Sequence, residues 1–515
     1  MGSPFRLKRT AHIFAGLLIV LLFFQGCAPS ARDIFIKQAN RQPDNERFLN
    51  LLDEAVAEED VGNASVGTIA GFPYLRVDRF LAGVPPLLSF DDEKSCWARW
   101  VLEKGIVTRE KEIACLSPDA QKRLASAAGT TPDPASLSRH MNTCAISMFT
   151  NDQSREGFFE AVTEAAEVPG EYVTSLRIAG AYPLTSLPVV LLTRKAHKRM
   201  RQWHQQQADD IPVHGKLVHY RCVGATILNA GDADAVKKRI AKTADNALSV
   251  PRPDSVDVLI LARAFAPVLI QDETGPNDRI GRIVWRNGEI AVDTDTPVVY
   301  YYLTNAFYRD RPIVQINYAA WYPARKGGES PWIEQGRIDG LTIRISLDSR
   351  GVPFMVDMMN NCGCYHFFMP RKGVVKAIKP KRFTIDAFIP RELPAEFPEK
   401  RLTVQMNTGW HQVRHIDTSP PANAGEADNG AVPYTLLPYD FLETLPKTGG
   451  TCESMFDNKG IVKGSGRIEP LLLFPMGIPK VGSMRQRGNH ALKLVGREHF
   501  SDPRLFDNNF EYVDD

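Results

Sequence analysis

The chain lacks a second long hydrophobic run, an excess of one charge and the short motifs by which many enzymes are recognised. After the first 30 residues no run approaches the ~18 apolar residues of a membrane span, so the remainder is expected to be a soluble body. The 62 Lys and Arg residues nearly balance the 60 Asp and Glu residues, which argues against a nucleic-acid-binding protein. No Gly-x-Ser-x-Gly, Gly-x-x-x-x-Gly-Lys, Gly-x-Gly-x-x-Gly or His-Glu-x-x-His pattern occurs. An enzyme is therefore less expected but not excluded, because catalytic sites also assemble from distant residues.

The first 30 residues have the pattern of a secretory signal. Three basic residues precede an apolar run over 13–24, which is shorter than the ~20 residues needed to cross a bilayer. The run ends at Gly26-Cys27, and this order resembles the signal of bacterial lipoproteins. The resemblance implies a signal peptide over 1–26, lipidation of Cys27 and, because Ala28 is not Asp, the periplasmic face of the outer membrane. An uncleaved N-terminal anchor is the alternative.

Cysteine pairing is only partly constrained by the sequence. Apart from Cys27, the cysteines are Cys96, Cys115, Cys144, Cys222, Cys362, Cys364 and Cys452. An oxidising compartment permits disulfides, and because seven is odd at least one thiol stays unpaired. Cys96 and Cys115 lie in one helical region, and we expect them to form a disulfide.

Helical periodicity dominates residues 31 to about 208. The segments "NERFLNLLDEAVAEEDV", "SCWARWVLEKGI" and "SREGFFEAVTEAAEV" all repeat apolar residues at helical spacing. The proline-rich stretch "PRPDSVD" at 251–257 interrupts this pattern and is typical of a linker. We therefore expect a mainly helical domain over 27–250 and a second domain over 256–515.

Short runs rich in β-branched and aromatic residues follow the linker. Examples are "PVVYYYLTNAF", "IVQINYAAWYPA" and "RLTVQMNTGW", each bounded by turn-forming residues. In "LTIRISLDSRGVPFMV", alternating apolar residues flank Asp348-Ser349-Arg350-Gly351, which predicts a β-hairpin. The expected fold class is α+β, with a helical N-terminal half and a mainly antiparallel, sandwich-like C-terminal half.

The strand-rich region carries a family resemblance. The segments "FAPVLIQDE", "VVYYYLTN", "VQINYAAWYP" and "RIDGLTIRISLDSRGVPFMV" resemble uncharacterised proteobacterial lipoproteins. Over residues 264–370 they distantly resemble the vacuolar-protein-sorting 62 and necrosis-inducing-like β-sandwich families. Those families place a metal-binding His-Asp-Trp-Glu sequence where this chain has Ile338-Asp339-Gly340-Leu341, so only Asp339 matches. The resemblance implies a β-sandwich fold, and it does not carry the metal site over intact.

The stretch "NNCGCYHFF" at 360–368 is one candidate site. As a strand it would place Cys362, Cys364 and His366 on one face. Cys362 and His366 would then lie roughly 13 Å apart, too far to share one zinc ion unless Gly363 forms a turn or bulge. The alternatives are a functional site and buried free thiols on an inner strand.

The stretch "GWHQVRHID" is a second candidate. His411 and His415 are four residues apart, which on a helix would make a zinc pair, but no Glu follows His411 and the preceding residues are strand-like. Either histidine could instead join Asp339 or His366 from a neighbouring strand. The tentative metal ligands, for one zinc ion, are Asp339, Cys364, His366, His411 and His415.

A basic segment follows the apolar part of "PLTSLPVVLLTRKAHKRMRQWHQQQ". Its residues are Arg194, Lys195, Lys198, Arg199 and Arg201. Such a segment can lie against anionic lipid headgroups, although the charges could also form the solvated face of a helix. The leading hypothesis is thus a lipid-anchored, periplasm-facing envelope protein with a non-catalytic ligand- or partner-binding role. The alternative is a metal-dependent hydrolase.

Overall fold

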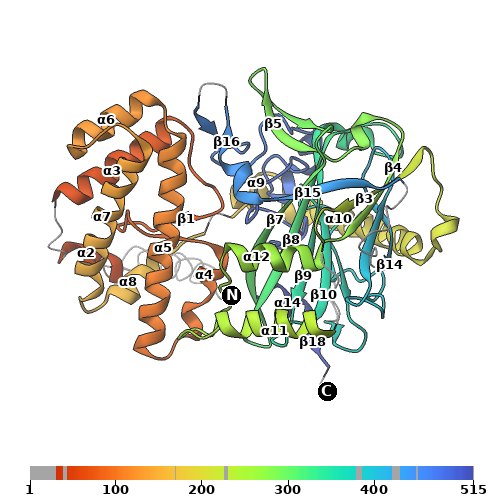
Figure 1. Cartoon of the computed structure of the whole chain (residues 1–515), viewed down its shortest axis with the longest axis horizontal. Coiled ribbons are helices and arrows are strands. Elements are labelled where there is room, and N and C mark those ends of the chain that lie inside the picture. The colour runs from red at the N-terminus through yellow and green to blue at the C-terminus, as the bar shows by residue number, and fades with distance from the viewer. Residues whose placement is uncertain are drawn as a thin grey trace, which may run out of the picture.

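The computed structural model describes residues 30–38, 43–168, 170–225, 230–378, 385–419, 430–447 and 450–513. The expected signal peptide at 1–26 and the lipidation site Cys27 lie outside these residues. In the described part of the chain, no helix combines the length and apolar character needed to cross a bilayer. Figure 1 shows a helical part, in red and orange, beside a strand-rich part.

The N-terminal helices pack around a hydrophobic cluster of their own. They are α2 (Ala31–Lys37), α3 (Pro43–Glu58), α4 (Arg79–Gly83), α5 (Asp91–Cys115), α6 (Pro118–Ala128), α7 (Pro134–Gln153) and α8 (Phe158–Ala165). Ser117 and Asp133 accept hydrogen bonds from the first turns of α6 and α7, and each is followed by proline. Because proline suits the first helical position and these side chains satisfy free N–H groups, the two helices begin where the sequence dictates.

Ten strands form one mixed sheet in the order β11-β10-β9-β8-β7-β15-β3-β4-β13-β14. Their bounds are β3 (Lys216–Cys222), β4 (Val268–Glu273), β7 (Val298–Tyr308), β8 (Arg311–Arg325), β9 (Gly336–Leu347), β10 (Pro353–Asn360), β11 (Phe367–Pro370), β13 (Arg401–Met406), β14 (Val413–Ser419) and β15 (Val432–Pro438). The pairs β7·β15, β15·β3 and β4·β13 are parallel, and the other pairs are antiparallel.

The sheet curls, so that its two ends share one hydrophobic cluster. Phe367 of β11 and Ile416 of β14 both belong to it. Three helices add side chains to the same cluster: α10 (Tyr182–Gln205), α11 (Ala230–Thr243) and α12 (Ser255–Phe265). Figure 1 shows α11 and α12 crossing in front of the strands.

Short elements complete the described chain. They are β1 (Gly67–Thr68), β2 (Arg76–Val77), α9 (Thr174–Ala179), β5 (Arg282–Arg286), β6 (Glu289–Asp293), β12 (Val375–Ala377), β16 (Leu445–Pro446), β17 (Cys452–Glu453), α13 (Pro470–Leu473), α14 (Leu505–Asn509) and β18 (Phe510–Tyr512), with 3-10 turns at 85–87, 208–210, 276–278, 332–334, 439–443 and 474–476.

The predicted α+β class is confirmed, and the main strands of the described chain form one curled ten-stranded sheet, beside four two-stranded sheets, rather than the two facing sheets of a sandwich. The expected boundary at 251–257 falls inside the strand-rich unit, because β3 precedes it in sequence yet lies between β15 and β4. "PRPDSVD" separates α11 from α12, and both helices pack on the same core. The helical cluster instead draws its residues mainly from the chain before position 169.

The expected Cys96–Cys115 disulfide is wrong. Both residues lie in α5, and nineteen residues at ~1.5 Å each place them roughly 28 Å apart along the helix. Cys115 is bonded to Cys452, which ties the last turn of α5 to β17. Cys96 is a buried free thiol.

Candidate functional site

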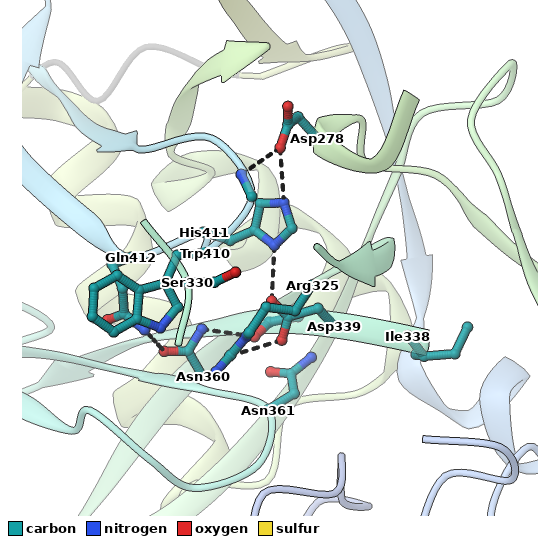
Figure 2. A network of polar contacts seen from close by, with 12 residues as sticks. Asp278, Arg325, Ser330, Ile338, Asp339, Asn360, Asn361, Trp410, His411 and Gln412 are labelled. Carbon is teal, nitrogen blue, oxygen red and sulfur yellow. Dashed lines mark hydrogen bonds and ion pairs between the residues drawn. The ribbon is translucent and has the colours of Figure 1, made fainter. Parts of the chain in front are cut away.

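Two of the tentative metal ligands, Asp339 and His411, meet in the interior, where they form an ion-pair network with Arg325. Arg325 ends β8, Asp339 lies on the adjacent strand β9, and His411 precedes β14. His411 Nδ1 lies 2.8 Å from Asp339 Oδ2. Arg325 donates two hydrogen bonds to the same carboxylate, at 3.0 and 2.9 Å. Figure 2 shows His411 and Arg325 converging on Asp339.

His411 is held from three sides. Its Nε2 lies 3.3 Å from Asp278 Oδ1, and the Tyr322 ring stacks on the imidazole with 3.9 Å between centroids. Asp278 also accepts the Gly409 N–H at 2.7 Å, which fixes the loop before β14. The backbone of His411 has φ +54°, a left-handed conformation that is uncommon for a residue with a side chain. The surrounding contacts therefore determine the position of this ring.

The electrostatics of the network favour ionised side chains. Burial alone would raise the pKa of Asp339, but Arg325 and His411 hold it below its usual range. Burial would lower the pKa of His411, but hydrogen bonds with Asp278 and Asp339 raise it above its usual range. These shifts favour an imidazolium between two carboxylates, fully enclosed by protein.

Glu334 connects the network to a neighbouring cavity. Arg325 Nη1 donates to Glu334 Oε2 at 2.8 Å, and Trp410 Nε1 donates to the same oxygen at 2.9 Å. Tyr365 donates its hydroxyl to Glu334 Oε1 at 2.6 Å. Because Glu334 and Tyr365 also line the cavity, the network forms part of its wall.

The five tentative ligands do not fit a shared metal ion. The oxygens of Asp339 are occupied by Arg325 and His411. His366 Nε2 lies 2.8 Å from Asp357, which is paired with Arg344, and His415 is 4.0 Å from Asp417. Among the described residues, no group of three or more His, Cys, Asp and Glu side chains is arranged to hold an ion. Arg325 neutralises the Asp339 carboxylate in the position that a bound metal cation would otherwise occupy.

The cavity has a volume of about 300 Å³, within the range of small-molecule sites. Its apolar lining comes from several elements and includes Val189, Leu192, Met200, Phe368, Phe388 and Leu473. Of the tentative ligands, Cys364 and His366 line it, whereas Asp339, His411 and His415 do not. Polar side chains from other elements also line it, among them His197, Asp386, Glu469, Lys493 and Glu498, and a further polar group lies at the turn between β10 and β11.

That turn replaces the strand expected over "NNCGCYHFF". β10 ends at Asn360 and β11 begins at Phe367. The Gly363 N–H donates to the Asn360 carbonyl at 2.8 Å, and Gly363 has φ +88°. A Cβ at Gly363 would lie 2.4 Å from the Ala491 carbonyl oxygen, so only glycine fits. The turn brings Cys362 and Cys364 together at the cavity wall.

Glu469 adds an unpaired carboxyl group to the cavity. It is 7% exposed, and its Oε2 has no hydrogen-bond partner among the described residues. Burial raises the pKa of Glu469 to about 8, with further repulsion from Cys362 and Glu334. Near neutral pH the carboxyl is mostly uncharged and can donate or accept a hydrogen bond.

The helix α10 covers one side of the cavity and bears the predicted basic residues on its outside. Leu184, Leu187 and Leu191 are 72%, 43% and 67% exposed at helical spacing, and Lys195 and Lys198 continue the same helix face. Two of the five basic residues also contact rings: Arg199 lies over Trp203 at 4.8 Å, and Arg201 lies over Phe388 at 5.5 Å. The exposed apolar surface extends onto the segment after Glu469 through Leu471 and Leu472, at 76% and 65% exposure.

A larger cavity, about 1190 Å³, lies between the helical bundle and the C-terminal segments. Its walls are rich in charged groups, several of which are paired, such as Arg76 with Asp53 at 2.8 Å. Glu112 also lines it, and burial raises the pKa of this carboxyl. Among the described residues, the lining of this cavity contains no thiol.

No motif marks Asp278, Arg325, Glu334 or Glu469, and these residues were not predicted. Asp278 lies in a turn, and Glu469 is a single carboxylate before the apolar run "PLLLFP". A glutamate next to several apolar residues is a weak indication of burial, and only the fold reveals its neighbours. Comparison of the chain with protein-family models, curated proteins and solved structures gives no match. The cavity and the adjoining ion-pair network are therefore the features of the chain that indicate a function.

Proposed function

We propose that the chain is a lipid-anchored envelope protein of the periplasmic face of the outer membrane, and that it binds an apolar, acyl-type ligand in the cavity beneath α10. One observation carries the proposal: the helix that covers an apolar cavity also presents exposed leucines to its surroundings. Exposed apolar surface of this kind is typical of contact with a membrane or a partner. Leu192 belongs to both features, since it is 66% exposed and lines the cavity.

Charge along α10 favours a membrane over a protein partner. The exposed face is leucine-rich up to Leu191 and basic from Arg194 onward. An interfacial helix with such a division places its apolar part among acyl chains and its basic part near anionic headgroups. A cavity next to this surface would receive its ligand directly from the lipid phase.

The polar end of the ligand should be uncharged. Glu469 offers an unpaired oxygen and is mostly protonated at neutral pH. A hydrogen bond to a hydroxyl, amide or protonated carboxyl group would satisfy this oxygen, whereas an anion would add repulsion beside Glu334.

Photo-crosslinking tests the ligand. The full chain is reconstituted in vesicles with a diazirine-bearing fatty alcohol, whose hydroxyl group is uncharged, then irradiated and digested for mass spectrometry. We expect adducts on peptides that line the cavity, such as 189–200 and 362–368. Ala196→Trp fills the cavity and should reduce those adducts several-fold, whereas Gln202→Trp, on the exposed side of α10, should not. Adducts confined to the outer face of α10, or unchanged by Ala196→Trp, would contradict a ligand cavity.

The anchor is tested separately. Cys27→Ser should block processing or release the protein from membranes, measured by fractionation and by mass spectrometry of the N-terminal peptide. If this variant is cleaved and fractionates with membranes like the parent, the lipoprotein proposal is wrong.

A further inference from the structure

The turn at 361–366 places two thiols side by side. The Cys364 N–H donates to Cys362 Sγ at 3.4 Å, and the Asn360 N–H donates to the Cys364 carbonyl at 3.0 Å. A disulfide requires Cα atoms about 4.4–6.8 Å apart, and residues two apart in a straight strand lie at the upper end, near ~6.6 Å. The bend at Gly363 shortens that separation. The conformation of the turn therefore suits a bond between Cys362 and Cys364.

The two thiols have different roles. A hydrogen bond from the Cys364 thiol lowers the pKa of Cys362 and raises the pKa of Cys364. Cys362 is 4% exposed, whereas Cys364 is half-buried and more accessible from the cavity. Because the thiolate is the attacking species, the lowered pKa favours Cys362 as the attacking sulfur and Cys364 as the resolving sulfur, and both line the cavity.

We propose that Cys362 and Cys364 form a reversible dithiol–disulfide couple that exchanges with a low-molecular-weight disulfide entering the cavity. The other free thiols provide a contrast, since Cys96 and Cys144 are buried and Cys222, at the end of β3, is half-buried, and none of the three lines this cavity. The Cys115–Cys452 disulfide independently indicates an oxidising compartment, where such reagents occur. This couple does not depend on the proposed acyl ligand.

The exchange balances as two displacements. Cys362, as its thiolate, attacks one sulfur of the small disulfide, and the first small thiolate leaves. The Cys364 thiol then gives its proton to the Glu469 carboxylate while its sulfur attacks Cys362 Sγ, and the second small thiolate leaves with the proton held by Glu469. The two protein sulfurs lose two electrons to the small disulfide, which becomes one thiol and one thiolate.

Glu469 acts among several ionisable neighbours. Arg325, Glu334, Cys362, Cys364 and Arg467 interact with it electrostatically or line its cavity. His197 of α10, His366, Lys493 and Glu498 line other parts of the cavity. Lys493 is paired with Glu498 at 3.0 Å, His366 with Asp357 at 2.8 Å and Glu334 with Arg325 at 2.8 Å. Of the remaining cavity carboxyls, Asp386 and Glu469, Glu469 is the one whose charge raises the pKa of Cys364.

A redox titration of the full chain tests the couple. The protein is equilibrated in buffers of reduced and oxidised dithiothreitol, alkylated, digested and analysed by mass spectrometry. We expect the peptide with Cys362 and Cys364 to pass from two alkyl groups to none, with a loss of 2 Da, at one reversible midpoint. Cys364→Ser should abolish this transition, and Cys144→Ser should leave it unchanged. Two alkyl groups at every potential would overturn the proposal.

The pH profile tests the role of Glu469. The rate of oxidation by a small neutral disulfide should rise with an inflection near pH 8 in the parent, and Glu469→Gln should remove the inflection. If Glu469→Gln keeps the inflection, Glu469 is not the proton acceptor. A folding defect in this variant would appear in its circular dichroism spectrum, and Glu469→Asp, which keeps the carboxyl, should then restore the pH-dependent rate.

Discussion

The ion-pair network around His411 and the cavity behind it share Glu334 and Tyr365, yet they satisfy their polar groups differently. In the network Asp339 is contacted by both Arg325 and His411, so its charge is compensated within the protein. In the cavity the Glu469 Oε2 atom has no hydrogen-bond partner among the described residues. The charges of the network are thus paired within the protein, although His411 Nε2 and the Tyr322 hydroxyl have no hydrogen-bond partner among the described residues, and the cavity can still accept a hydrogen bond at Glu469.

This difference separates structural from functional roles. A buried ion pair is strongly destabilising to break but performs no chemistry while its groups are occupied. A buried carboxyl with a shifted pKa and no partner is costly to keep, and such groups are concentrated at functional sites. The histidines and Asp339 attracted attention in the sequence, but the neighbouring cavity is the better functional candidate.

The largest expected effect comes from breaking the network. Asp339→Asn would leave the Arg325 guanidinium with one carboxylate partner, Glu334, and His411 with only Asp278. Removal of one partner from a buried pair typically costs about 3–5 kcal/mol. Urea unfolding monitored by circular dichroism measures this loss.

An exposed ion pair provides the control for that experiment. Glu289 is paired with Arg337 at 2.7 Å but is 66% exposed, and Glu289→Gln should cost no more than about 1 kcal/mol. If Asp339→Asn is no more destabilising than Glu289→Gln, the network is not what holds β8, β9 and the loop before β14 together.

A smaller, pH-dependent effect is expected for Glu469→Gln. The pKa of Glu469 is about 8 in the folded chain and near its ordinary 4.5 when unfolded, so the unfolded state binds fewer protons between these values. The contribution of the protonated Glu469 carboxyl to the free energy of unfolding is therefore complete below pH 4.5 and declines as pH rises toward 8. The free energy of unfolding of Glu469→Gln, measured relative to that of the parent, should therefore increase by on the order of 3 kcal/mol between pH 5 and pH 8.

Urea unfolding of both proteins at several pH values measures that gain. A difference in the free energy of unfolding that stays constant across the range would mean that Glu469 is not held in its protonated form. A difference that decreases as pH rises would mean that folding lowers the pKa of Glu469 instead of raising it.

Much of the fold follows from local pattern. β7, β8 and the β9–β10 hairpin occupy the predicted segments, because alternation and turn residues act over a few positions. The segment "VLILARAFAPVLIQDE" directly follows the proline-rich linker, where the sequence predicts short strands, but it forms α12 followed by β4. A short apolar run suits a buried helix or a buried strand equally, and Asp254, which caps α12, is the signal that favours the helix.

The site was less predictable, because it depends on strand order. The curl of the sheet brings the loop before β14 against β9, so His411 contacts Asp339 across 72 residues of sequence. Spacing offered His415 as the partner of His411 only on a helix, and it left Asp339 or His366 on a neighbouring strand as the alternative; the structure pairs His411 with Asp339 and places His415 near Asp417. Likewise Cys452, the partner of Cys115, is 337 residues away, and no periodicity carries that information.

The smallest effect on stability, and a clear one on binding, is expected at the surface of α10. Lys195 and Lys198 are exposed and follow the leucine face. In vesicles that contain phosphatidylglycerol, amide hydrogen exchange over 183–193 should slow relative to neutral phosphatidylcholine vesicles. Because each basic residue near an anionic surface contributes about 1 kcal/mol, Lys195→Glu with Lys198→Glu should weaken this protection at least about tenfold.

The free energy of unfolding should change by less than about 0.5 kcal/mol in the same double variant, because both side chains are exposed. Lys237→Glu with Lys238→Glu makes the same charge change on exposed positions of α11 and is the matched control. If the control variant loses protection equally, the net charge of the protein, and not the position of the charges on α10, explains the effect. Equal protection on neutral vesicles would show that the leucines alone determine contact, and would remove the argument that charge selects a membrane as the partner of α10.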